Sequence, residues 1–377
     1  MEDRALKVMS VFGTRPEAVK MCPLILRLQR TDGIRSIVCL TGQHREMLDQ
    51  VMESFHVTAD YDLDLMRPEQ TLTEVTAGVL QGLEPILIRE APDIVLVHGD
   101  TASSLAAAMA AFYRRIPVAH VEAGLRTYHK YAPFPEEVNR LMLSRLADWH
   151  FAPTEGNAEN LKREGITENV FVTGNTVIDA IRLTVRDGYR FHSPALRDFD
   201  AFPGRTVLLT AHRRENFGEP LENICRAAVR LTRELPDVRL IYPVHLNPAV
   251  RSVAERILSG QERILLCEPL SVADMHNLIA RSTLVMTDSG GLQEEAPACG
   301  VPVLVLRRET ERPEAVEAGT VRVVGTDEES IFAGAVTLLT DREQYDAMAH
   351  AVNPYGDGHA SERIVRCLLR AKKTEIN

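Results

Sequence analysis

The sequence predicts an α/β protein that contains two doubly wound parallel sheets. Short apolar runs rich in β-branched residues recur along the 377 residues, and segments with helical spacing of apolar residues separate them. Strands that are apolar throughout indicate sheets covered on both faces. Alternation of strands with helices indicates parallel pairing through crossover helices. A polar, irregular segment near the middle of the chain divides the strands into two groups and therefore predicts two domains.

The predicted strands fall on either side of that segment, which runs from 182 to 205 and contains Pro194, Pro203 and Gly204. The predicted strands cover 7–12, 36–40, 94–97, 118–121 and 170–172, then 207–209, 240–242, 264–266, 284–286, 303–306 and 321–324. We expect domains at 1–175 and 200–360, with 176–199 as the linker region. The stretch 361–375 carries apolar residues at helical spacing and predicts a helix that packs on one of the domains.

Composition restricts the partners. The chain has 43 basic and 53 acidic residues, a formal net charge of -10, which argues against broad binding to nucleic acid or to anionic membranes. Any anion site must therefore be local. The longest apolar stretch, 105–112, is too short to span a bilayer, and the charged residues 1–7 do not resemble a signal peptide. Six scattered cysteines without a CxxC pair are typical of a reducing compartment, so we expect a cytoplasmic protein.

The segment 287–296, TDSGGLQEEA, carries the most specific signal. An apolar run that reads as a buried strand passes through Ser289, Gly290 and Gly291 into a predicted helix. Such a turn presents backbone N–H groups at the positive end of a helix dipole, with no Cβ to obstruct a ligand. It predicts a phosphate site, and a carboxylate at Glu294 or Glu295 could reach a sugar hydroxyl beyond it. The alternative is that Ser289 merely caps the helix.

Several cofactor motifs are absent from the sequence. It contains no GxGxxG and no GxxxxGK[ST], which argues against NAD, FAD and ATP hydrolysis. None of the 12 histidines has metal-ligand spacing such as HExxH, so we expect no metal.

Polar residues follow the predicted strands, where ligands bind in open parallel sheets. Arg15 and Lys20 could supply cations to a phosphate, or could be a solvated helical turn. His212 and Arg213 could face a diphosphate, or could belong to a surface ion-pair cluster. Because both predicted domains direct charged residues to the same kind of sheet edge, the sequence predicts two halves of one cleft.

Nine motifs together resemble the bacterial non-hydrolysing UDP-N-acetylglucosamine 2-epimerases. They occur in matching order from about residue 7 to about residue 368, so the resemblance covers nearly the whole chain. The motifs are FGTRPEAVK (12–20), TGQHREM (41–47), HGDT (98–101), HVEAGLRT (120–127), PFPEEVNR (133–140), HRREN (212–216), DSGG (288–291), ERPE (311–314) and NPYGDG (353–358).

This resemblance implies two Rossmann-like domains of the GT-B type, with the C-terminal helix returning to the first domain. It implies interconversion of UDP-N-acetylglucosamine and UDP-N-acetylmannosamine for bacterial envelope polysaccharides, by homodimers that need neither NAD nor metal. Because C2 of the sugar is not adjacent to a carbonyl, the route without NAD is elimination of UDP to 2-acetamidoglucal, followed by its re-addition. That route needs carboxylates near the sugar and cations around the diphosphate.

The resemblance also implies roles for single residues. The catalytic residues of the family fall on Asp100, Glu122, Glu136 and His212. Its UDP-binding positions fall on Arg15, Lys20, Ser289, Gly290, Gly291, Glu295 and Arg312. A regulatory UDP-N-acetylglucosamine site, with 66–70 near it, falls on Gln43, Arg213 and His245.

Three other functions stay open at this point. A hydrolysing epimerase would release N-acetylmannosamine and UDP, and a GT-B glycosyltransferase would use the same phosphate turn. A UDP-sugar sensor would keep the turn but would have no need for Asp100, Glu122 and Glu136 together.

Overall fold

The computed structural model describes residues 4–42, 45–65, 67 and 70–374, and its contacts divide the chain into two compact units. Unit 1 consists of Met1–Leu183 and Tyr355–Asn377, and unit 2 of Thr184–Pro354. The chain passes between the units after Leu183 and after Pro354. The predicted bounds of 1–175, 176–199 and 200–360 therefore differ from this division, because residues 176–183 contact unit 1 and residues 184–199 contact unit 2.

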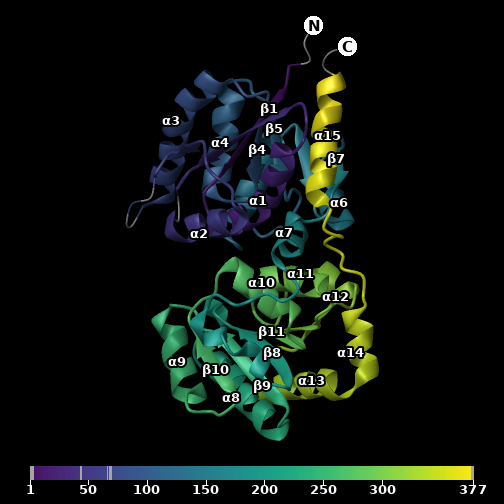
Figure 1. Ribbon diagram of the computed structural model, residues 1–377. Coiled ribbons are helices and arrows are strands. Elements are labelled where there is room, and N and C mark those ends of the chain that lie inside the picture. Colours follow the sequence, from purple (N-terminus) through teal and green to yellow (C-terminus); the bar gives the residue numbers. More distant parts are fainter. Residues whose placement is uncertain (1–3, 43–44, 66, 68–69, 375–377) are drawn as a thin grey trace. The chain divides into compact units, whose positions relative to one another are not determined.

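Unit 1 contains a seven-stranded sheet in the order β3-β2-β1-β4-β5-β6-β7 with parallel pairing throughout (Figure 1). Helices α1, α2 and α15 pack together, as do α3, α4 and α5, so both faces of the sheet are covered. Its elements are β1 (Leu6–Phe12), α1 (Arg15–Gln29), β2 (Ile34–Leu40), α2 (Arg45–Phe55), β3 (Tyr61–Asp62), α3 (Leu72–Glu90), β4 (Ile94–His98), α4 (Ala102–Tyr113), β5 (Val118–Val121), α5 (Glu136–Leu146), β6 (Trp149–Ala152), α6 (Glu155–Arg163), β7 (Val170–Val172), α7 (Thr176–Thr184) and α15 (Ala360–Thr374).

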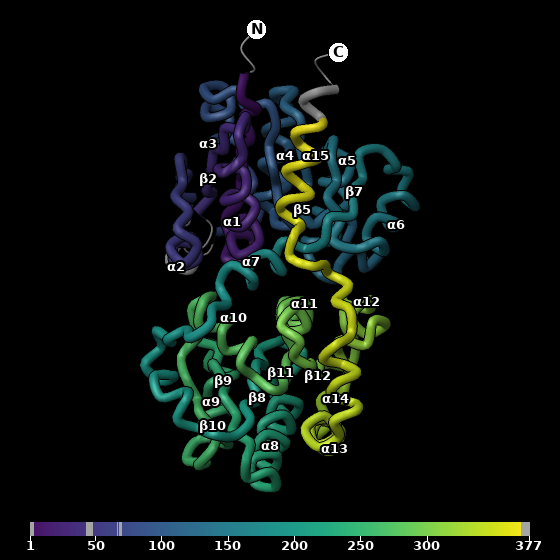
Figure 2. The backbone as a smooth tube through the Cα atoms, turned by 45° about the vertical axis from the view of Figure 1, so that its right-hand side comes forward, coloured from purple at the N-terminus to yellow at the C-terminus, as the bar shows by residue number. Residues whose placement is uncertain are grey.

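Unit 2 contains a six-stranded parallel sheet in the order β10-β9-β8-β11-β12-β13 (Figure 2). Its elements are three short 3₁₀ helices (Pro194–Leu196, Phe199–Ala201 and Arg214–Asn216), β8 (Arg205–Thr210), α8 (Glu219–Glu234), β9 (Val238–Pro243), α9 (Pro248–Leu258), β10 (Ile264–Cys267), α10 (Val272–Ala280), β11 (Leu284–Thr287), α11 (Gly290–Ala298), β12 (Val303–Val305), α12 (Pro313–Glu317), β13 (Val321–Val323), α13 (Glu328–Thr340) and α14 (Arg342–Ala349).

The predicted fold class of two parallel α/β domains is confirmed, and all eleven predicted strands are present. Two strands were missed. β3 is only two residues long and pairs with the end of β2. β6 contains His150, a polar residue in an otherwise apolar run, which hides the buried-strand pattern.

Local sequence explains the elements that position the site. β11 is buried along its whole length, as expected for an apolar central strand. α8 buries Leu221, Ile224, Cys225 and Ala228, which occupy positions i, i+3, i+4 and i+7 and form one helix face. The register of β8 and β11 sets Thr210 opposite Thr287, and their hydroxyl oxygens lie 2.6 Å apart.

Two buried histidines in unit 1 make its stability depend on pH. Burial lowers the pKa of His120 to about 3 and that of His150 to about 4. In the unfolded chain both would titrate near pH 6.5, so the unfolded state binds more protons than the native state between these values. We therefore expect the free energy of unfolding to fall as the pH falls from 6.5 to 4, by up to about 1.4 kcal/mol per pH unit for each histidine.

Trp149, the only tryptophan of the chain, reports this transition because it lies in β6 beside His150. Urea unfolding followed by its fluorescence, at intervals between pH 4.5 and 6.5, measures the slope. The matched variant is His120→Gln, whose amide nitrogen can replace the His120 Nε2 contact with the Gly99 carbonyl oxygen (2.7 Å). An unchanged slope in this variant would contradict the assignment.

Candidate active site

Each sheet has one position where the strand order reverses, between β1 and β4 in unit 1 and between β8 and β11 in unit 2. Ligands of open α/β sheets bind at the carboxyl ends of the strands at such positions. The segments that follow these four strands, 13–15, 99–101, 211–213 and 288–291, contain many of the predicted site residues. Each unit therefore presents its own group of candidate residues, and the two groups are described separately.

In unit 1, a buried carboxylate fixes the segments that follow β1 and β4. Glu17 Oε2 accepts hydrogen bonds from the backbone N–H groups of Gly13 (3.0 Å) and Thr14 (2.7 Å). Its Oε1 accepts hydrogen bonds from the hydroxyls of Thr101 (2.8 Å) and Ser104 (2.7 Å). Thr14 and Glu17 also form a capping box, which starts α1 beside Pro16. The predicted site residues Arg15 and Asp100 are thus attached to segments that one carboxylate connects.

Glu122 lies at the centre of a buried polar group. It follows β5 with φ of 65°, in the left-handed region that residues other than glycine seldom adopt. Its Oε2 pairs with Lys20 Nζ, accepts a hydrogen bond from Asn175 Nδ2 (3.1 Å) and lies 3.5 Å from His98 Nε2. Backbone strain of this kind concentrates at functional sites.

The environment of Glu122 keeps it ionised. Burial acts to raise the pKa of this carboxyl, but the positive charge of Lys20 and the contact with His98 outweigh burial, so the pKa lies well below its usual range. The sequence assigned Lys20 to UDP, whereas here it pairs with a predicted catalytic acid. His98 and Asn175 were not predicted as site residues, although His98 belongs to a quoted motif and Asn175 follows β7.

The other two predicted acids differ from Glu122. Asp100 Oδ2 accepts a hydrogen bond from Arg140 Nε (2.8 Å) and forms an ion pair with Arg140 Nη2 (2.7 Å). Asn139 Nδ2 donates to the Asp100 backbone carbonyl (2.8 Å). Glu136 is the first residue of α5, and its Oε2 is buried without a hydrogen-bond partner in the described part of the chain. Its carboxylate faces the favourable end of the α5 dipole.

In unit 2, the predicted phosphate turn begins a helix. α11 starts at Gly290, so both glycines lie inside the helix rather than ahead of it. Ser289 occupies the N-cap position, but its side chain makes no capping hydrogen bond, and its N–H donates to Thr287 Oγ1 (2.9 Å). Ser289 therefore takes the N-cap position, as the alternative predicted, but its hydroxyl does not cap the helix.

Two guanidinium groups lie over this helix start. A Cβ built on Gly290 would be 3.4 Å from Arg312 Nη2 and 3.6 Å from Arg213 Nη2. Both cations are therefore near the N–H groups that open α11. Planar guanidinium groups beside a helix N-terminus suit a phosphate or diphosphate.

The buried carboxylate of Asp288 fixes the segment after β8. Its Oδ2 accepts hydrogen bonds from the backbone N–H groups of His212 (2.8 Å) and Arg213 (2.8 Å) and from Asn216 Nδ2 (3.0 Å). Its Oδ1 lies 3.5 Å from His212 Nδ1. Asp288 therefore links the strand end that carries the glycine turn to the one that carries His212.

His212 stacks on His245, with ring centroids 5.2 Å apart and planes inclined by 8°. Burial lowers the pKa of His212, with His245 and Arg213 acting in the same direction and Asp288 opposing them. A neutral imidazole is thus favoured at neutral pH, and it can accept or donate a proton. The catalytic candidate His212 and the regulatory candidates Arg213 and His245 lie together in unit 2.

The structure distinguishes the two carboxylates that the sequence proposed for a sugar hydroxyl. Glu294 is buried, and Arg312 Nε donates to its Oε1 at 2.5 Å. Glu295 Oε1 lies 3.3 Å from the Cβ position of Gly291, and its Oε2 lies 3.7 Å from His276 Nε2. Glu294 thus holds Arg312, and Glu295 is the carboxylate beside the glycine turn.

Some of the predicted site residues are not among those that the structure describes. Gln43 and, from the segment 66–70, Met66, Pro68 and Glu69 are not among the described residues. Within the described ranges there is no group of three His, Cys, Asp or Glu residues that could hold a metal ion. Nor does any described helix have the length and hydropathy to cross a membrane.

The chain matches one family model and is similar in sequence to curated proteins of the same description. The family model described as UDP-N-acetylglucosamine 2-epimerase matches residues 26–369. The UDP-N-acetylglucosamine 2-epimerase of Bacillus subtilis strain 168 is 54% identical over 367 residues, which cover 97% of this chain and 96% of that protein.

Two solved structures carry nucleotide ligands. The Neisseria meningitidis UDP-GlcNAc 2-epimerase bound to UDP-GlcNAc has a TM-score of 0.86 and 47% identity, covering 97% of this chain and 100% of that one. The Methanocaldococcus jannaschii enzyme in complex with UDP-GlcNAc and UDP has a TM-score of 0.79 and 34% identity, with the same coverage.

Proposed function

Because the chain belongs to the UDP-N-acetylglucosamine 2-epimerase family, we propose that it interconverts UDP-N-acetylglucosamine and UDP-N-acetylmannosamine without net hydrolysis. The observation that carries the proposal is Glu122, a largely buried carboxylate that Lys20 keeps ionised in the same unit as the predicted acids Asp100 and Glu136. A UDP-sugar sensor would gain nothing from this arrangement. Burying a charge is costly unless it is paired, so such groups mark sites of chemistry.

The proposed reaction is an elimination followed by an addition. A carboxylate removes the C2 proton, the C1–O bond to UDP breaks, and the C1–C2 double bond of 2-acetamidoglucal forms. A proton then returns to C2 on the opposite face, and a UDP oxygen attacks C1. We assign proton transfer at C2 and stabilisation of positive charge at C1 to Asp100, Glu122 and Glu136 as a group.

Retention of UDP is assigned mainly to unit 2. In unit 2, Arg312 stabilises the departing diphosphate at the start of α11, where Ser289, Gly290 and Gly291 supply backbone N–H groups. His212 donates or accepts a proton there. Glu295 binds the ribose. In unit 1, we assign Arg15 and Lys20 to UDP as further cations.

Incubation with UDP-N-acetylglucosamine in D₂O, followed by NMR, tests the reaction. We expect UDP-N-acetylmannosamine that carries deuterium at C2. Free N-acetylmannosamine would instead support the hydrolysing epimerase. Unchanged substrate would contradict both epimerases and would leave the glycosyltransferase, which needs an acceptor, or the sensor.

The role of Glu295 predicts a selective loss of affinity. Glu295→Gln removes a charged hydrogen bond to the ribose, which is worth about 1.5–3 kcal/mol, so UDP should bind roughly 10–100-fold more weakly. Pyrophosphate, which has no ribose, should bind as it does to the wild type. Arg312→Gln is the matched control, since it should weaken both ligands. Calorimetry of the six protein–ligand pairs measures these affinities, and equal loss of both ligands in Glu295→Gln would refute the assignment.

We further propose a regulatory UDP-N-acetylglucosamine site that uses Arg213, His245 and Gln43. Its support is the position of Arg213 and His245 beside His212, together with the M. jannaschii complex that holds both UDP-GlcNAc and UDP. The velocity with UDP-N-acetylmannosamine should rise when UDP-N-acetylglucosamine is added, and less so in His245→Ala. If the velocity of the wild type does not change when UDP-N-acetylglucosamine is added, this proposal is contradicted.

A homodimer and a cytoplasmic location complete the proposal. Phe112, Tyr113, Leu141 and Met142 of α4 and α5 are exposed large apolar residues that line one surface hollow, and such patches often mark subunit contacts. Light scattering on the wild type and on Phe112→Glu tests the dimer. All six cysteines are unpaired thiols, which supports a reducing compartment.

A further inference from the structure

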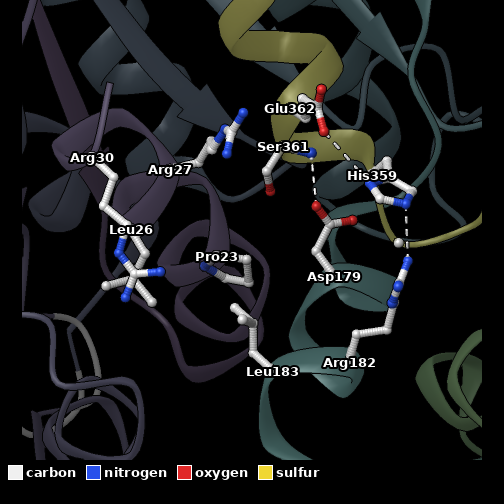
Figure 3. A pocket seen from close by; sticks show the side chains of 11 residues that line it. Pro23, Leu26, Arg27, Arg30, Asp179, Arg182, Leu183, His359, Ser361 and Glu362 are labelled. Atoms are coloured by element: carbon white, nitrogen blue, oxygen red, sulfur yellow. Dashed lines mark hydrogen bonds and ion pairs between the residues drawn. The ribbon is translucent and has the colours of Figure 1, made fainter. Parts of the chain in front are cut away.

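A second polar pocket lies in unit 1, between α1, α7 and the start of α15 (Figure 3). Its volume is about 360 Å³, within the range of roughly 300–1,000 Å³ that is usual for small-molecule sites. None of its lining residues is among the predicted catalytic, substrate-binding or regulatory residues. The pocket is therefore a candidate for a ligand other than the substrate.

Three arginines line this pocket. Arg27 and Arg30 are one turn apart near the end of α1, so their side chains share one helix face. Within the described residues neither forms an ion pair. Arg182 of α7 donates from Nη1 to the Asp357 backbone carbonyl (2.8 Å) and lies 3.1 Å from His359 Nε2. Neither of these partners is a carboxylate, so among the residues that the structure describes all three positive charges lack an anionic partner.

The two carboxylates of the pocket are already engaged. Asp179 accepts hydrogen bonds from the N–H groups of Ala360 (3.1 Å) and Ser361 (2.8 Å), and so caps α15. Glu362 accepts a hydrogen bond from Arg366 (2.8 Å) and lies 3.5 Å from His359 Nδ1. The pocket therefore has an excess of positive charge in a chain whose formal net charge is -10.

The Ser361 hydroxyl is a further polar group beside the pocket. Ser361 is 5% exposed. Its hydroxyl lies close enough to the Asp179 carboxylate to act on the pKa of that group, but it has no partner with good hydrogen-bond geometry in the described part of the chain. In Figure 3 this hydroxyl points into the space between Arg27, Pro23 and Asp179. A buried hydroxyl without a partner is costly unless a ligand or water completes it.

We propose that this pocket binds a small phosphate monoester. Its phosphate oxygens would accept hydrogen bonds from Arg27, Arg30 and the Ser361 hydroxyl, because guanidinium groups bind phosphate in a bidentate manner. The organic part would contact the apolar side chains of Leu26 and Leu183.

This ligand would connect α1 to both places where the chain crosses between the units. Leu183 is the last residue of the first segment of unit 1, and Tyr355, which begins the returning segment, is followed closely by Gly358 and His359 of the pocket wall. α1 also carries Arg15 and Lys20 at its other end. Binding would thus stabilise unit 1 at its connections to the rest of the chain.

Calorimetric titration of the full chain with phenyl phosphate tests the proposal. The protein is first saturated with UDP, which under the proposed function fills the diphosphate site of unit 2. We expect one phenyl phosphate per chain and at least ten-fold weaker binding to the Arg27→Gln/Arg30→Gln variant. Arg163→Gln, at an exposed arginine of α6, is the matched control and should bind like the wild type. Phenyl phosphate should also raise the Tm of the UDP-saturated wild type but not that of the double variant.

Two outcomes would overturn the proposal. One is the absence of binding to the UDP-saturated wild type, and the other is equal affinity in the double variant, which would mean an adventitious anion only. Failure of the proposed function would appear separately, as failure of UDP to bind in the first titration. An unchanged UDP affinity in the double variant shows that it is folded. The Arg27→Lys/Arg30→Lys variant keeps the charges but not the bidentate geometry, so it should bind phenyl phosphate with intermediate affinity.

Discussion

We expect Glu122→Gln to lower kcat by about 10²–10⁴-fold, the usual cost of removing a group that transfers a proton. Glutamine keeps the size of the side chain and can still contact Asn175, but it cannot accept a proton or carry the negative charge that Lys20 and His98 stabilise. Steady-state turnover of UDP-N-acetylglucosamine, together with deuterium incorporation at C2 in D₂O, measures the loss.

Two controls separate chemistry from disruption in this variant. UDP affinity should change by no more than a few-fold, because the groups assigned mainly to UDP lie in unit 2. The Lys20→Met/Glu122→Gln variant removes the uncompensated lysine, and only a recovery of its turnover is informative, because Lys20 is itself assigned to UDP. Recovery of turnover in the double variant would show that Glu122 serves only to neutralise Lys20.

The second large effect concerns stability. Glu17→Leu should destabilise unit 1 by about 2–6 kcal/mol, because two buried backbone N–H groups, those of Gly13 and Thr14, would lose their acceptor, at about 1–3 kcal/mol each. This is a large share of the roughly 5–15 kcal/mol that stabilises a typical domain. Urea unfolding followed by Trp149 fluorescence measures it.

Glu17→Gln is the matched control for that substitution. Its amide oxygen can still accept from Gly13 and Thr14, and its amide nitrogen can donate to the hydroxyl oxygens of Thr101 and Ser104, which can act as acceptors. Ser104 can then donate to the His98 carbonyl oxygen, which it already contacts at 2.7 Å. We expect a loss of no more than about 1.5 kcal/mol, and equal destabilisation by both variants would refute the hydrogen-bond explanation.

The sequence predicted those strands whose signal lies in neighbouring residues. A strand that is apolar throughout, such as β11, is typical of a sheet covered on both faces, so it can be recognised from the sequence alone. The capping box of Thr14 and Glu17 was not predicted, and neither was the bridge that Glu17 makes to the segment after β4. β3 was missed because two residues carry no periodicity.

What the sequence determined by itself is the fold class and the set of residue types at the strand ends, because periodicity and motif order are properties of neighbours along the chain. Only the tertiary structure decided which of them pair. It joined Lys20 to Glu122 across 102 positions and paired Arg312 with Glu294. It also brought Arg213 and Arg312 to Gly290. Strand order and burial decide which side chains meet in this way. The energy of an ion pair depends on the distance between its charges in space, and that distance cannot be read from their spacing along the chain.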